Sequence, residues 1–408
     1  MTPDAPLDAP LVVGVVGAGA MGAGIAQVAA SAGHRVILGD AHAGAVSHAR
    51  ASIGTALARD VEKGRRTRES AETTAARLIE AGDLSNGYGA YADCDVVIEA
   101  VVEDLAVKRA LFAGLEAAVR DDCVLATNTS SLSVAALGGA CRAAARVIGV
   151  HFFNPAPVMP LVEVVPAITT SLAVSAAMVA LVTAWGKEAV VSTDTPGFIV
   201  NRVARPFYGE SLRIVEERLA DVATVDWAMR TLGGFRMGPF ELMDLIGHDV
   251  NYAVTTSIFD AFHHDPRYRP SIAQRRLVEA GLLGRKSGRG FHAYGAGAPV
   301  LVPTEDHVLG QSIVDRVLAM LVNEAVEALH VGVASADDIE RAMRRGVNYP
   351  RGLLAWGDEI GAAEILRRLD TLQADYGDDR YRPSVLLRRR ARAGMPLVND
   401  PMESHSHG

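Results

Sequence analysis

A glycine-rich turn directly after an apolar run at residues 11–16 constrains the fold of this chain more than any other feature. The turn reads Gly17-Ala-Gly19-Ala20-Met21-Gly22, and we expect it to join a buried strand to a helix. Gly17 permits the tight turn, Gly19 lets the backbone approach a pyrophosphate, and Gly22 lets the helix pack closely on the strand. The six residues therefore predict a dinucleotide-binding turn, with the phosphates at the helix amino terminus.

The residue after the next strand indicates which dinucleotide fits. An apolar run at 35–39 ends at Asp40, roughly twenty residues beyond the glycines, where a carboxylate can accept hydrogen bonds from a ribose. The same carboxylate would repel a 2′-phosphate, and no arginine follows within residues 41–44. We therefore predict NAD and not NADP. The alternative is a glycine-rich turn in another kind of α/β protein.

The order of apolar runs predicts two kinds of domain. Strands expected at 95–98, 123–126 and 147–150, with a helix at 105–119, favour an α/β Rossmann-type domain with a parallel, doubly wound sheet. After a turn-rich boundary the pattern becomes helical, so the remainder is all-α. The expected boundaries are 1–194 for the NAD-binding domain, 195–294 and 310–395 for two helical domains, 295–309 for a linker and 396–408 for a disordered tail.

The sequence of the helical part contains an internal repeat of two copies. Glutamate, glycine and aspartate positions recur at a constant offset: Glu210, Gly238, Asp244 and Gly247 return as Glu324, Gly352, Asp358 and Gly361. The segment Arg267-Tyr-Arg-Pro-Ser271 likewise returns at 380–384. In the second copy Asp315 stands at the place of Asn201, so we interpret that copy as degenerate.

Charge and cysteine content exclude several functions. A formal net charge of −8 gives no basis for nucleic-acid binding, which needs a basic surface. The three cysteines lack metal-binding or CxxC spacing, so we expect no metal and a reducing compartment. The uncharged run at 11–33 could suggest a membrane helix, but its glycines fit a strand, a turn and a helix instead. The start of the chain has no basic region typical of a signal peptide, so we expect a cytoplasmic protein with no membrane partner.

Four side chains after the glycine turn suit the oxidation of a hydroxyl group beside a nicotinamide. Removing hydride from a secondary alcohol leaves an oxygen that must lose its proton, and His151 is the candidate base. Glu163 would pair with the other ring nitrogen and fix the tautomer. Ser130 and Asn201 would hold the substrate oxygens. Each also has a structural interpretation: a satisfied core histidine, a helix cap at Ser130 and a structural hydrogen bond at Asn201.

A basic cluster lies in the charged helical segment at 43–80 and reads Lys63-Gly-Arg65-Arg66-Thr-Arg68. Such clusters are usually solvated helix faces. The sharper hypothesis is a dock for an anionic part of the substrate, with Lys63 as the candidate residue.

Taken together, these residues resemble the 3-hydroxyacyl-CoA dehydrogenase family. The resemblance covers about residues 11–294 through the glycine turn, 128–131, 151–155, Glu163, 195–202 and 237–241. The duplicated carboxyl region, with Asn348-Tyr-Pro-Arg-Gly352 and Trp356-Gly357, is similar to longer bacterial members that act on 3-hydroxyadipyl-CoA in phenylacetate breakdown. An alternative within the family is a 3-hydroxybutyryl-CoA dehydrogenase of fatty-acid or butanoate metabolism.

The resemblance implies reversible, NAD-dependent oxidation of an L-3-hydroxyacyl-CoA to a 3-ketoacyl-CoA. It makes His151 the base and Glu163 its partner, with Ser130 and Asn201 beside the reacting oxygens. It places six residues around NAD: Asp40, Glu103, Lys108, Ser130, Asn154 and Lys286. Pro160 departs from the family, because many relatives have lysine there, and this leaves acyl-chain contacts at that position open.

Two other classes of protein could share these features. The rivals are a dehydrogenase that uses a lysine base on a free 3-hydroxy acid, and a non-enzymatic, lens-type structural relative that retains NAD. Relatives with one helical domain dimerise through it, so a second copy can cover the same face within one chain. We expect such an internal pseudo-dimer, and a homodimer of whole chains stays possible.

Overall fold

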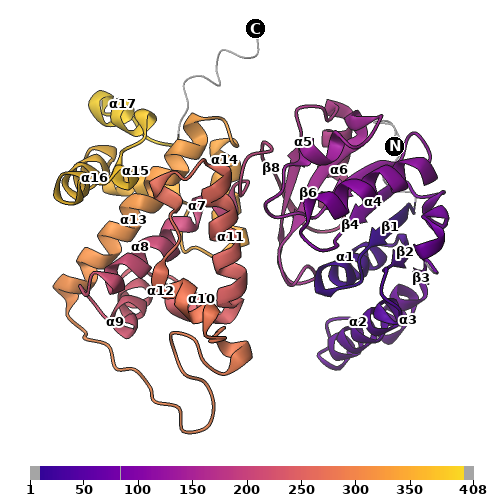
Figure 1. The fold of residues 1–408 in the computed structure, drawn as a ribbon, viewed down its shortest axis with the longest axis horizontal. Helices are drawn as coiled ribbons and strands as arrows, with labels where there is room; N and C mark the ends of the chain where they lie inside the picture. The colour runs from indigo at the N-terminus through magenta and orange to yellow at the C-terminus, as the bar shows by residue number, and fades with distance from the viewer. Residues whose placement is uncertain (1–9, 83, 399–408) are drawn as a thin grey trace. The chain divides into compact units, whose positions relative to one another are not determined.

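The structure is a computed structural model, and it describes residues 10–82 and 84–398. The chain divides into two compact units, residues 1–195 and 196–408, and each is described by itself. We call them the sheet unit and the helical unit (Figure 1). The candidate site residues from 17 to 163 lie in the sheet unit, whereas Asn201 and Lys286 lie in the helical unit.

The sheet unit is built on one sheet of eight strands in the order β3-β2-β1-β4-β5-β6-β7-β8. The strands are β1 Val12–Val16, β2 Arg35–Gly39, β3 Leu78–Glu80, β4 Val96–Glu99, β5 Val124–Thr127, β6 Val147–Phe152, β7 Leu161–Pro166 and β8 Glu188–Val191. The strands from β3 to β6 pair in parallel, as the alternation of strands and helices predicts. Their carboxyl ends therefore meet at one edge of the sheet.

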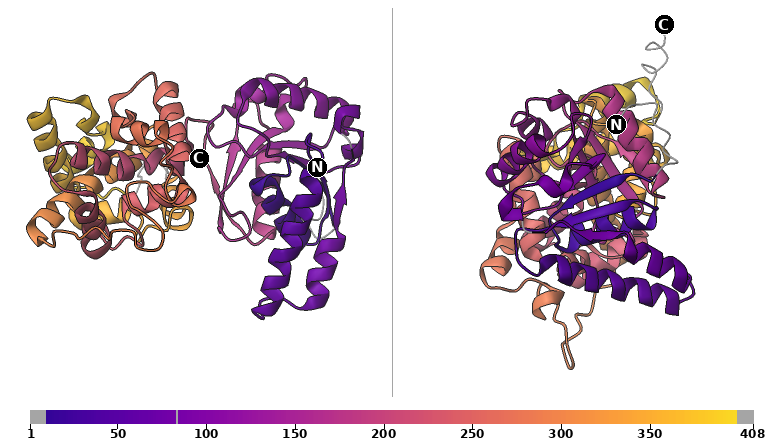
Figure 2. Two further views of the ribbon diagram at one scale, coloured as in Figure 1. Left: turned by 60° about the horizontal axis from the view of Figure 1, so that its bottom comes forward. Right: turned by 90° about the vertical axis from the view of Figure 1, so that its right-hand side faces the viewer.

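Helices cover the sheet between these strands. They are α1 Ala20–Ser31, α2 Ala45–Glu62, α3 Arg68–Ala76, η1 Leu84–Asn86, η2 Gly89–Tyr91, α4 Leu105–Ala118, α5 Val134–Gly138, η3 Ala144–Arg146 and α6 Leu172–Ala184. The long charged segment after β2 forms α2 and α3, which pack against each other as a helical pair beside β3 (Figures 1 and 2).

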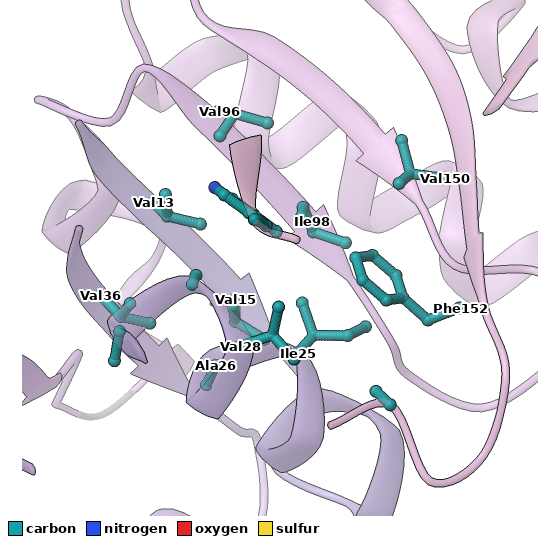
Figure 3. Packing of buried hydrophobic residues seen from close by; sticks show 14 of the residues in the cluster. Val13, Val15, Ile25, Ala26, Val28, Val36, Val96, Ile98, Val150 and Phe152 are labelled. Atoms are coloured by element: carbon teal, nitrogen blue, oxygen red, sulfur yellow. The ribbon is translucent and has the colours of Figure 1, made fainter. Parts of the chain in front are cut away.

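The core of this unit lies between α1 and the sheet. Ile25 and Val28 of α1 pack beside Val15 of β1, with Phe152 of β6 next along the sheet (Figure 3). All four side chains are less than 8 % exposed. Burial of such a side chain contributes roughly 1.5–3 kcal/mol, so this contact holds the middle of α1 against β1.

The far end of the sheet departs from the parallel arrangement that the sequence predicts. Strand β7 runs antiparallel to β6, and β8 pairs with β7 in parallel. The departure arises because only a short loop separates β6 from β7, and a parallel connection needs a crossover of a dozen or more residues. In the resulting register, residue 151 lies directly opposite residue 163.

The helical unit contains two series of helices in the same order. Its elements are α7 Val200–Val203, α8 Arg205–Glu216, α9 Val222–Trp227, the π-helical turn η4 Ala228–Leu232, α10 Pro239–Ile246, α11 His248–Ala261, η5 Pro266–Tyr268, α12 Ile272–Glu279 and η6 Arg285–Ser287, followed by α13 His307–His330, α14 Ala336–Gly346, α15 Leu353–Ile360, α16 Ala362–Tyr376, η7 Asp379–Tyr381 and α17 Val385–Ala393. We call the first series, to residue 294, copy 1, and the series from α13 onward copy 2. Helix α13 packs along α8 and also contacts α16 and α17 (Figure 1).

The two copies share local hydrogen bonds as well as helix order. Asp226 accepts from the amides of Phe240 and Glu241 at the start of α10, at 2.9 and 3.2 Å. Glu340 does the same at the start of α15, accepting from the amides of Leu354 and Ala355 at 2.7 and 3.4 Å. A side-chain carboxylate thus satisfies the free N–H groups of an equivalent helix start in each copy.

Buried carboxylates join the copies reciprocally. Glu210 of copy 1 accepts from Arg316 Nε of copy 2 at 3.0 Å, and Glu324 of copy 2 accepts from Arg202 Nε of copy 1 at 2.7 Å. Each also accepts from a tyrosine hydroxyl of the other copy, Tyr381 for Glu210 and Tyr268 for Glu324. Both glutamates are at most 2 % exposed. Each copy therefore supplies the cation for the other copy's buried anion, as in an isologous dimer interface.

The start and end of copy 2 differ from the predicted positions. Helix α13 begins at His307, before residue 310, and Thr304 of the linker already donates its amide to Thr224 of copy 1. At the other end, the amides of Leu397 and Val398 donate to Asp358, and Leu397 is 1 % exposed. The expectation of disorder from 396 is therefore wrong for residues 396–398, because an aspartate and a hydrophobic pocket hold them; residues 399–408 lie outside the described part of the chain.

Two absences hold for the residues that the structure describes. None of their helices is long and apolar enough to cross a membrane. Nor do their histidine, cysteine, aspartate and glutamate side chains form a group that could hold a metal ion.

We predict that Glu324→Gln destabilises the helical unit by about 3–5 kcal/mol, because it leaves Arg202 buried without a counter-charge. Glu210→Gln should cost a similar amount, since it leaves the buried Arg213 without a carboxylate, whereas Arg316 keeps Glu217. Denaturant unfolding followed by circular dichroism measures both. The matched control is Glu279→Gln, which breaks an exposed pair with Arg275 and should leave stability nearly unchanged. Equal stability of the wild type and the Glu324 variant would contradict the reciprocal arrangement as a source of stability.

Candidate active site

The glycine turn adopts the geometry that a dinucleotide requires. Gly17 has φ of 101°, and a Cβ there would lie 2.5 Å from the Ala100 carbonyl oxygen. A Cβ on Gly22 would collide with the Gly17 carbonyl oxygen. A Cβ on Gly19 would instead meet nothing within 4 Å. The first and third glycines are thus required by the protein itself, while Gly19 leaves room for a ligand to approach the backbone.

Helix α1 presents uncapped amides at this turn. Gly19 is its N-cap residue and supplies no side-chain oxygen to the amides of the first turn, which includes Ala20 and Met21. The positive end of the helix dipole therefore faces the turn with N–H donors available. These observations fit the pyrophosphate of NAD.

Asp40 follows β2 at the same edge of the sheet. Its carboxylate accepts from the amide of Ala18 at 2.7 Å and from the amide of His42 at 2.8 Å. Partial burial opposes the charge, but these backbone hydrogen bonds outweigh it and lower the pKa of Asp40 below its ordinary value. The group is therefore an anion near neutral pH. It ties the glycine turn to the end of β2, where a ribose would lie.

Glu103 organises the loop that carries Ser130. One of its oxygens accepts from the amides of Ser130 and Ser131 at 3.0 and 3.2 Å and from the Thr129 hydroxyl at 2.5 Å. Burial raises the pKa of Glu103, but the Lys108 ammonium and these hydrogen bonds lower it further, to below its ordinary value. Ser130 does not cap the following helix, because Ser133 is the N-cap of α5. The helix-cap interpretation of Ser130 is therefore wrong.

Lys108 lies behind Glu103. It is 1 % exposed, and its ammonium contacts Glu99 at 2.8 and 2.9 Å and Glu103 at 3.2 Å. This arrangement supports the position of Glu103 and, through it, the 129–131 loop. A direct contact between Lys108 and the cofactor stays a prediction.

His151 and Glu163 form a cross-strand pair. Because β6 and β7 are antiparallel, the two residues face each other in the register, and His151 Nδ1 lies 2.6 Å from Glu163 Oε2. His151 is 6 % exposed and Glu163 is fully buried. When Nδ1 carries the proton and donates to Glu163, the lone pair of the neutral ring is on Nε2. The pair is thus arranged as a base with an orienting carboxylate.

The loop between β6 and β7 carries Asn154 and is anchored at two points. Asn128 accepts the amide of Phe152 at 2.8 Å, immediately before the loop. The ammonium of Lys187 donates to the carbonyl oxygens of Ala156 and Met159 at 2.6 and 2.8 Å. Asn154 itself is exposed at the carboxyl edge of the sheet. Its position is compatible with the predicted contact to NAD.

Three predicted residues lie elsewhere. Asn201 is on α7 of the helical unit, and its side-chain amide has no hydrogen-bond partner among the described residues. Lys286, in the 284–288 segment of copy 1, contacts Asp249 at 2.5 Å and is half exposed. Lys63 is exposed at the carboxyl end of α2. The roles of all three stay predictions.

The sequence analysis missed the charged residues that position the loops and helices carrying the site residues. Glu99, Asp194 and Lys187 are not members of the motifs that the sequence analysis used. Asp194, for example, accepts from the amides of Val134 and Ala135 at the start of α5, at 2.9 and 2.7 Å. An apolar strand that ends in a charged residue, as β4 ends at Glu99, is the one signal that could have found a member of this group.

The chain matches two family models. Residues 12–195 match the model of the 3-hydroxyacyl-CoA dehydrogenase NAD-binding domain, and residues 197–294 and 313–397 match that of the 3-hydroxyacyl-CoA dehydrogenase C-terminal domain. The second model therefore matches both copies of the helical series.

Curated proteins and solved structures give the same result. The chain is 41 % identical to a 3-hydroxyadipyl-CoA dehydrogenase of Escherichia coli, over 93 % of this chain and 97 % of that protein. It is 40 % identical to a 3-hydroxybutyryl-CoA dehydrogenase of Bradyrhizobium diazoefficiens, over 71 % of this chain and 97 % of the relative. A crystal structure of a 3-hydroxybutyryl-CoA dehydrogenase from Escherichia coli superimposes with a TM-score of 0.89 at 40 % identity, covering 94 % of this chain and 99 % of the other.

We predict that Asp40→Asn narrows the preference for NAD over NADP by roughly tenfold or more, since a hydrogen bond to a charged group contributes about 1.5–3 kcal/mol. Asparagine can still accept a hydrogen bond from the Ala18 amide, so the substitution removes the negative charge and keeps the conformation of the turn. Calorimetric titration of both cofactors measures the effect. A wild-type protein that bound NADP as tightly as NAD would contradict the role of Asp40.

Proposed function

The chain belongs to the 3-hydroxyacyl-CoA dehydrogenase family, and from that premise we propose that it oxidises 3-hydroxyadipyl-CoA with His151 as the base. Membership establishes the reaction class: NAD-dependent, reversible oxidation of a 3-hydroxyacyl-CoA to the 3-ketoacyl-CoA. The observation that carries the residue assignment is the buried His151–Glu163 pair, at 2.6 Å, at the carboxyl edge of the sheet. The lysine base of the rival 3-hydroxy-acid dehydrogenases has no role in this arrangement.

The proton path follows from the tautomer. Glu163 accepts the Nδ1 proton and thereby directs the basic lone pair of His151 to Nε2. Nε2 takes the hydroxyl proton of the substrate, and Glu163 stabilises the imidazolium that forms. Bound NAD supplies the acceptor for the hydrogen that leaves the neighbouring carbon. In the reverse direction the same imidazolium returns the proton to the ketone oxygen.

Other residues hold the reactants. Glu103 fixes the 129–131 loop through its amides, and this fixes the position from which the Ser130 hydroxyl can donate to a substrate oxygen. The Asn201 amide, which has no partner among the described residues, is assigned to the thioester and hydroxyl oxygens. The amides at the start of α1 and the Asp40 carboxylate are assigned to the pyrophosphate and the ribose of NAD. Asn154 and Lys286 complete the proposed cofactor contacts.

The choice of acyl group rests on how much of the chain each relative matches. The relative named for 3-hydroxyadipyl-CoA matches 93 % of the chain, including copy 2, whereas that named for 3-hydroxybutyryl-CoA matches 71 %. The matched structure of almost full length is, however, named for 3-hydroxybutyryl-CoA. Oxidation of 3-hydroxybutyryl-CoA is therefore the second candidate function. A non-enzymatic role is disfavoured, because the His151–Glu163 pair is intact.

We expect NADH to form from L-3-hydroxyacyl-CoA thioesters, with the highest kcat/KM for 3-hydroxyadipyl-CoA. Absorbance of NADH over a panel of 3-hydroxybutyryl-, 3-hydroxyhexanoyl- and 3-hydroxyadipyl-CoA measures this. A higher kcat/KM for the butyryl thioester would replace the proposed substrate with the second candidate. Absence of turnover with every thioester would contradict the function itself.

We predict that His151→Ala lowers kcat on the order of 10² to 10⁴ fold, the usual loss when a positioned base is removed, and leaves the Kd for NAD nearly unchanged. Glu163→Gln should slow the same step, because a neutral amide holds the Nδ1–H tautomer less firmly and stabilises the imidazolium less than a carboxylate does. The matched control is His34→Gln: His34 is also buried in the sheet unit, where it accepts the Leu11 amide at 3.1 Å, and this change should leave kcat within a few fold. Wild-type turnover by the His151 variant would assign the base to another residue.

A further inference from the structure

A buried arginine of the helical unit has no carboxylate partner. Arg205 opens α8 and is 6 % exposed. Its Nε donates to the Asn201 carbonyl oxygen at 2.7 Å, and its Nη1 donates to the Thr255 hydroxyl at 3.1 Å. Both acceptors are neutral. Within the described part of the chain, no aspartate or glutamate lies within ion-pair distance of this guanidinium.

The two buried arginines that flank Arg205 along the chain are paired with carboxylates. Arg202 and Arg213, on either side of Arg205 along the chain, contact Glu324 and Glu210 at 2.7 and 2.8 Å. A buried cation without an anion is costly, because desolvation of the charge is not offset by an ion pair. The contrast suggests that the counter-charge of Arg205 belongs to a ligand.

The surroundings of Arg205 would suit a carboxylate. Its guanidinium lies 4.9 Å from the centre of the Tyr208 ring. The hydroxyl of Tyr349 is buried with no hydrogen-bond partner, and it interacts electrostatically with Arg205. Burial lowers the pKa of Arg205 and raises that of Tyr349, so Tyr349 is a neutral hydroxyl that can donate a hydrogen bond. An arginine fork with a neighbouring hydroxyl donor is a common means of binding a carboxylate.

Arg205 is one helical turn beyond Asn201. Four residues of helix advance about 6 Å along the axis, and the guanidinium already touches the Asn201 backbone. A carboxylate three carbon–carbon bonds beyond the hydroxyl-bearing carbon, as in a six-carbon diacid, spans a distance on this scale. If Asn201 holds the oxygens of the reacting end, Arg205 is within reach of the other end of such an acyl chain.

We propose that Arg205, together with the Tyr349 hydroxyl, binds a terminal carboxylate of the acyl chain and makes the enzyme selective for dicarboxylic 3-hydroxyacyl-CoA thioesters. The inference rests on the proposed function, in which Asn201 contacts the reacting oxygens. It names the group that would distinguish 3-hydroxyadipyl-CoA from an apolar thioester of equal length.

The proposal also gives copy 2 a second role. Tyr349 belongs to the 348–352 segment of copy 2, and it reaches into copy 1, where its ring centre lies 5.7 Å from Phe207 and 5.0 Å from Phe235. Asn348 takes the left-handed conformation, with φ of 54°, and so turns the chain just before Tyr349. Copy 2 therefore contributes a side chain to a binding position in copy 1, besides packing against it.

The test compares two thioesters that differ only at the far end, 3-hydroxyadipyl-CoA and 3-hydroxyhexanoyl-CoA. The wild type should favour the adipyl thioester in kcat/KM by roughly 10- to 10²-fold, the range for one charge-assisted hydrogen-bonded contact. Arg205→Met should abolish that ratio, because it should lower kcat/KM for the adipyl thioester by more than it lowers kcat/KM for the hexanoyl thioester. Arg205→Lys should retain part of the ratio, and Tyr349→Phe should lower it by a few fold.

The control is Arg213→Met, which removes an equally buried arginine from the same helix but one already paired with Glu210. It should leave the ratio at its wild-type value whatever its effect on stability. Equal use of both thioesters by the wild type would overturn this inference alone, even if Arg205→Met failed to fold. Equal losses on both thioesters in Arg205→Met would overturn it too, since Arg205 would then only support Asn201. A wild type that oxidised neither thioester would overturn the proposed function as well.

Discussion

The buried hydrogen bond between His151 and Glu163 is the interaction on which the site depends. A carboxylate that is fully buried is tolerated only where hydrogen bonds and charge offset its desolvation. The antiparallel register of β6 and β7 supplies that partner, because it sets the two residues directly opposite each other. A slip of β7 by one residue would turn Glu163 to the other face of the sheet, away from His151. The reversal of strand direction at the end of the sheet is thus the feature that creates the candidate base.

Buried charges in the helical unit are likewise paired with groups from other segments of the chain. Glu210 and Glu324 each accept a hydrogen bond from an arginine of the other copy, and Glu210 also pairs with Arg213 of its own copy. This reciprocity explains why copy 2 is retained although Asp315 replaces the asparagine of copy 1. Asp315 instead pairs with Arg368 within copy 2, at 3.1 Å. Arg205 stands apart from this scheme, and that exception points to a ligand.

The sequence predicted those features that can be recognised from neighbouring residues or from a repeat along the chain. The glycine turn, Asp40 and the duplicated helices are recognisable because their backbone or spacing requirements lie within a few residues or recur along the chain. The His151–Glu163 pair was identified from chemistry and from the resemblance, and its geometry is as expected. The strands β3, β7 and β8 were not predicted, since strands of three to six residues have too little periodicity to separate them from loops.

The sequence by itself therefore determined the class of the fold, the cofactor turn and the identity of the candidate catalytic side chains. Only the tertiary structure decided which buried charges have a partner of opposite charge, and which residue supplies that partner. It placed Lys108 behind Glu103, ordered residues 396–398 against Asp358 and left Arg205 without an anion. These outcomes depend on contacts between segments far apart in the chain, where burial sets the cost of each charge. Residue spacing carries no information about that cost, because the same side chain is inexpensive in water and costly in the core.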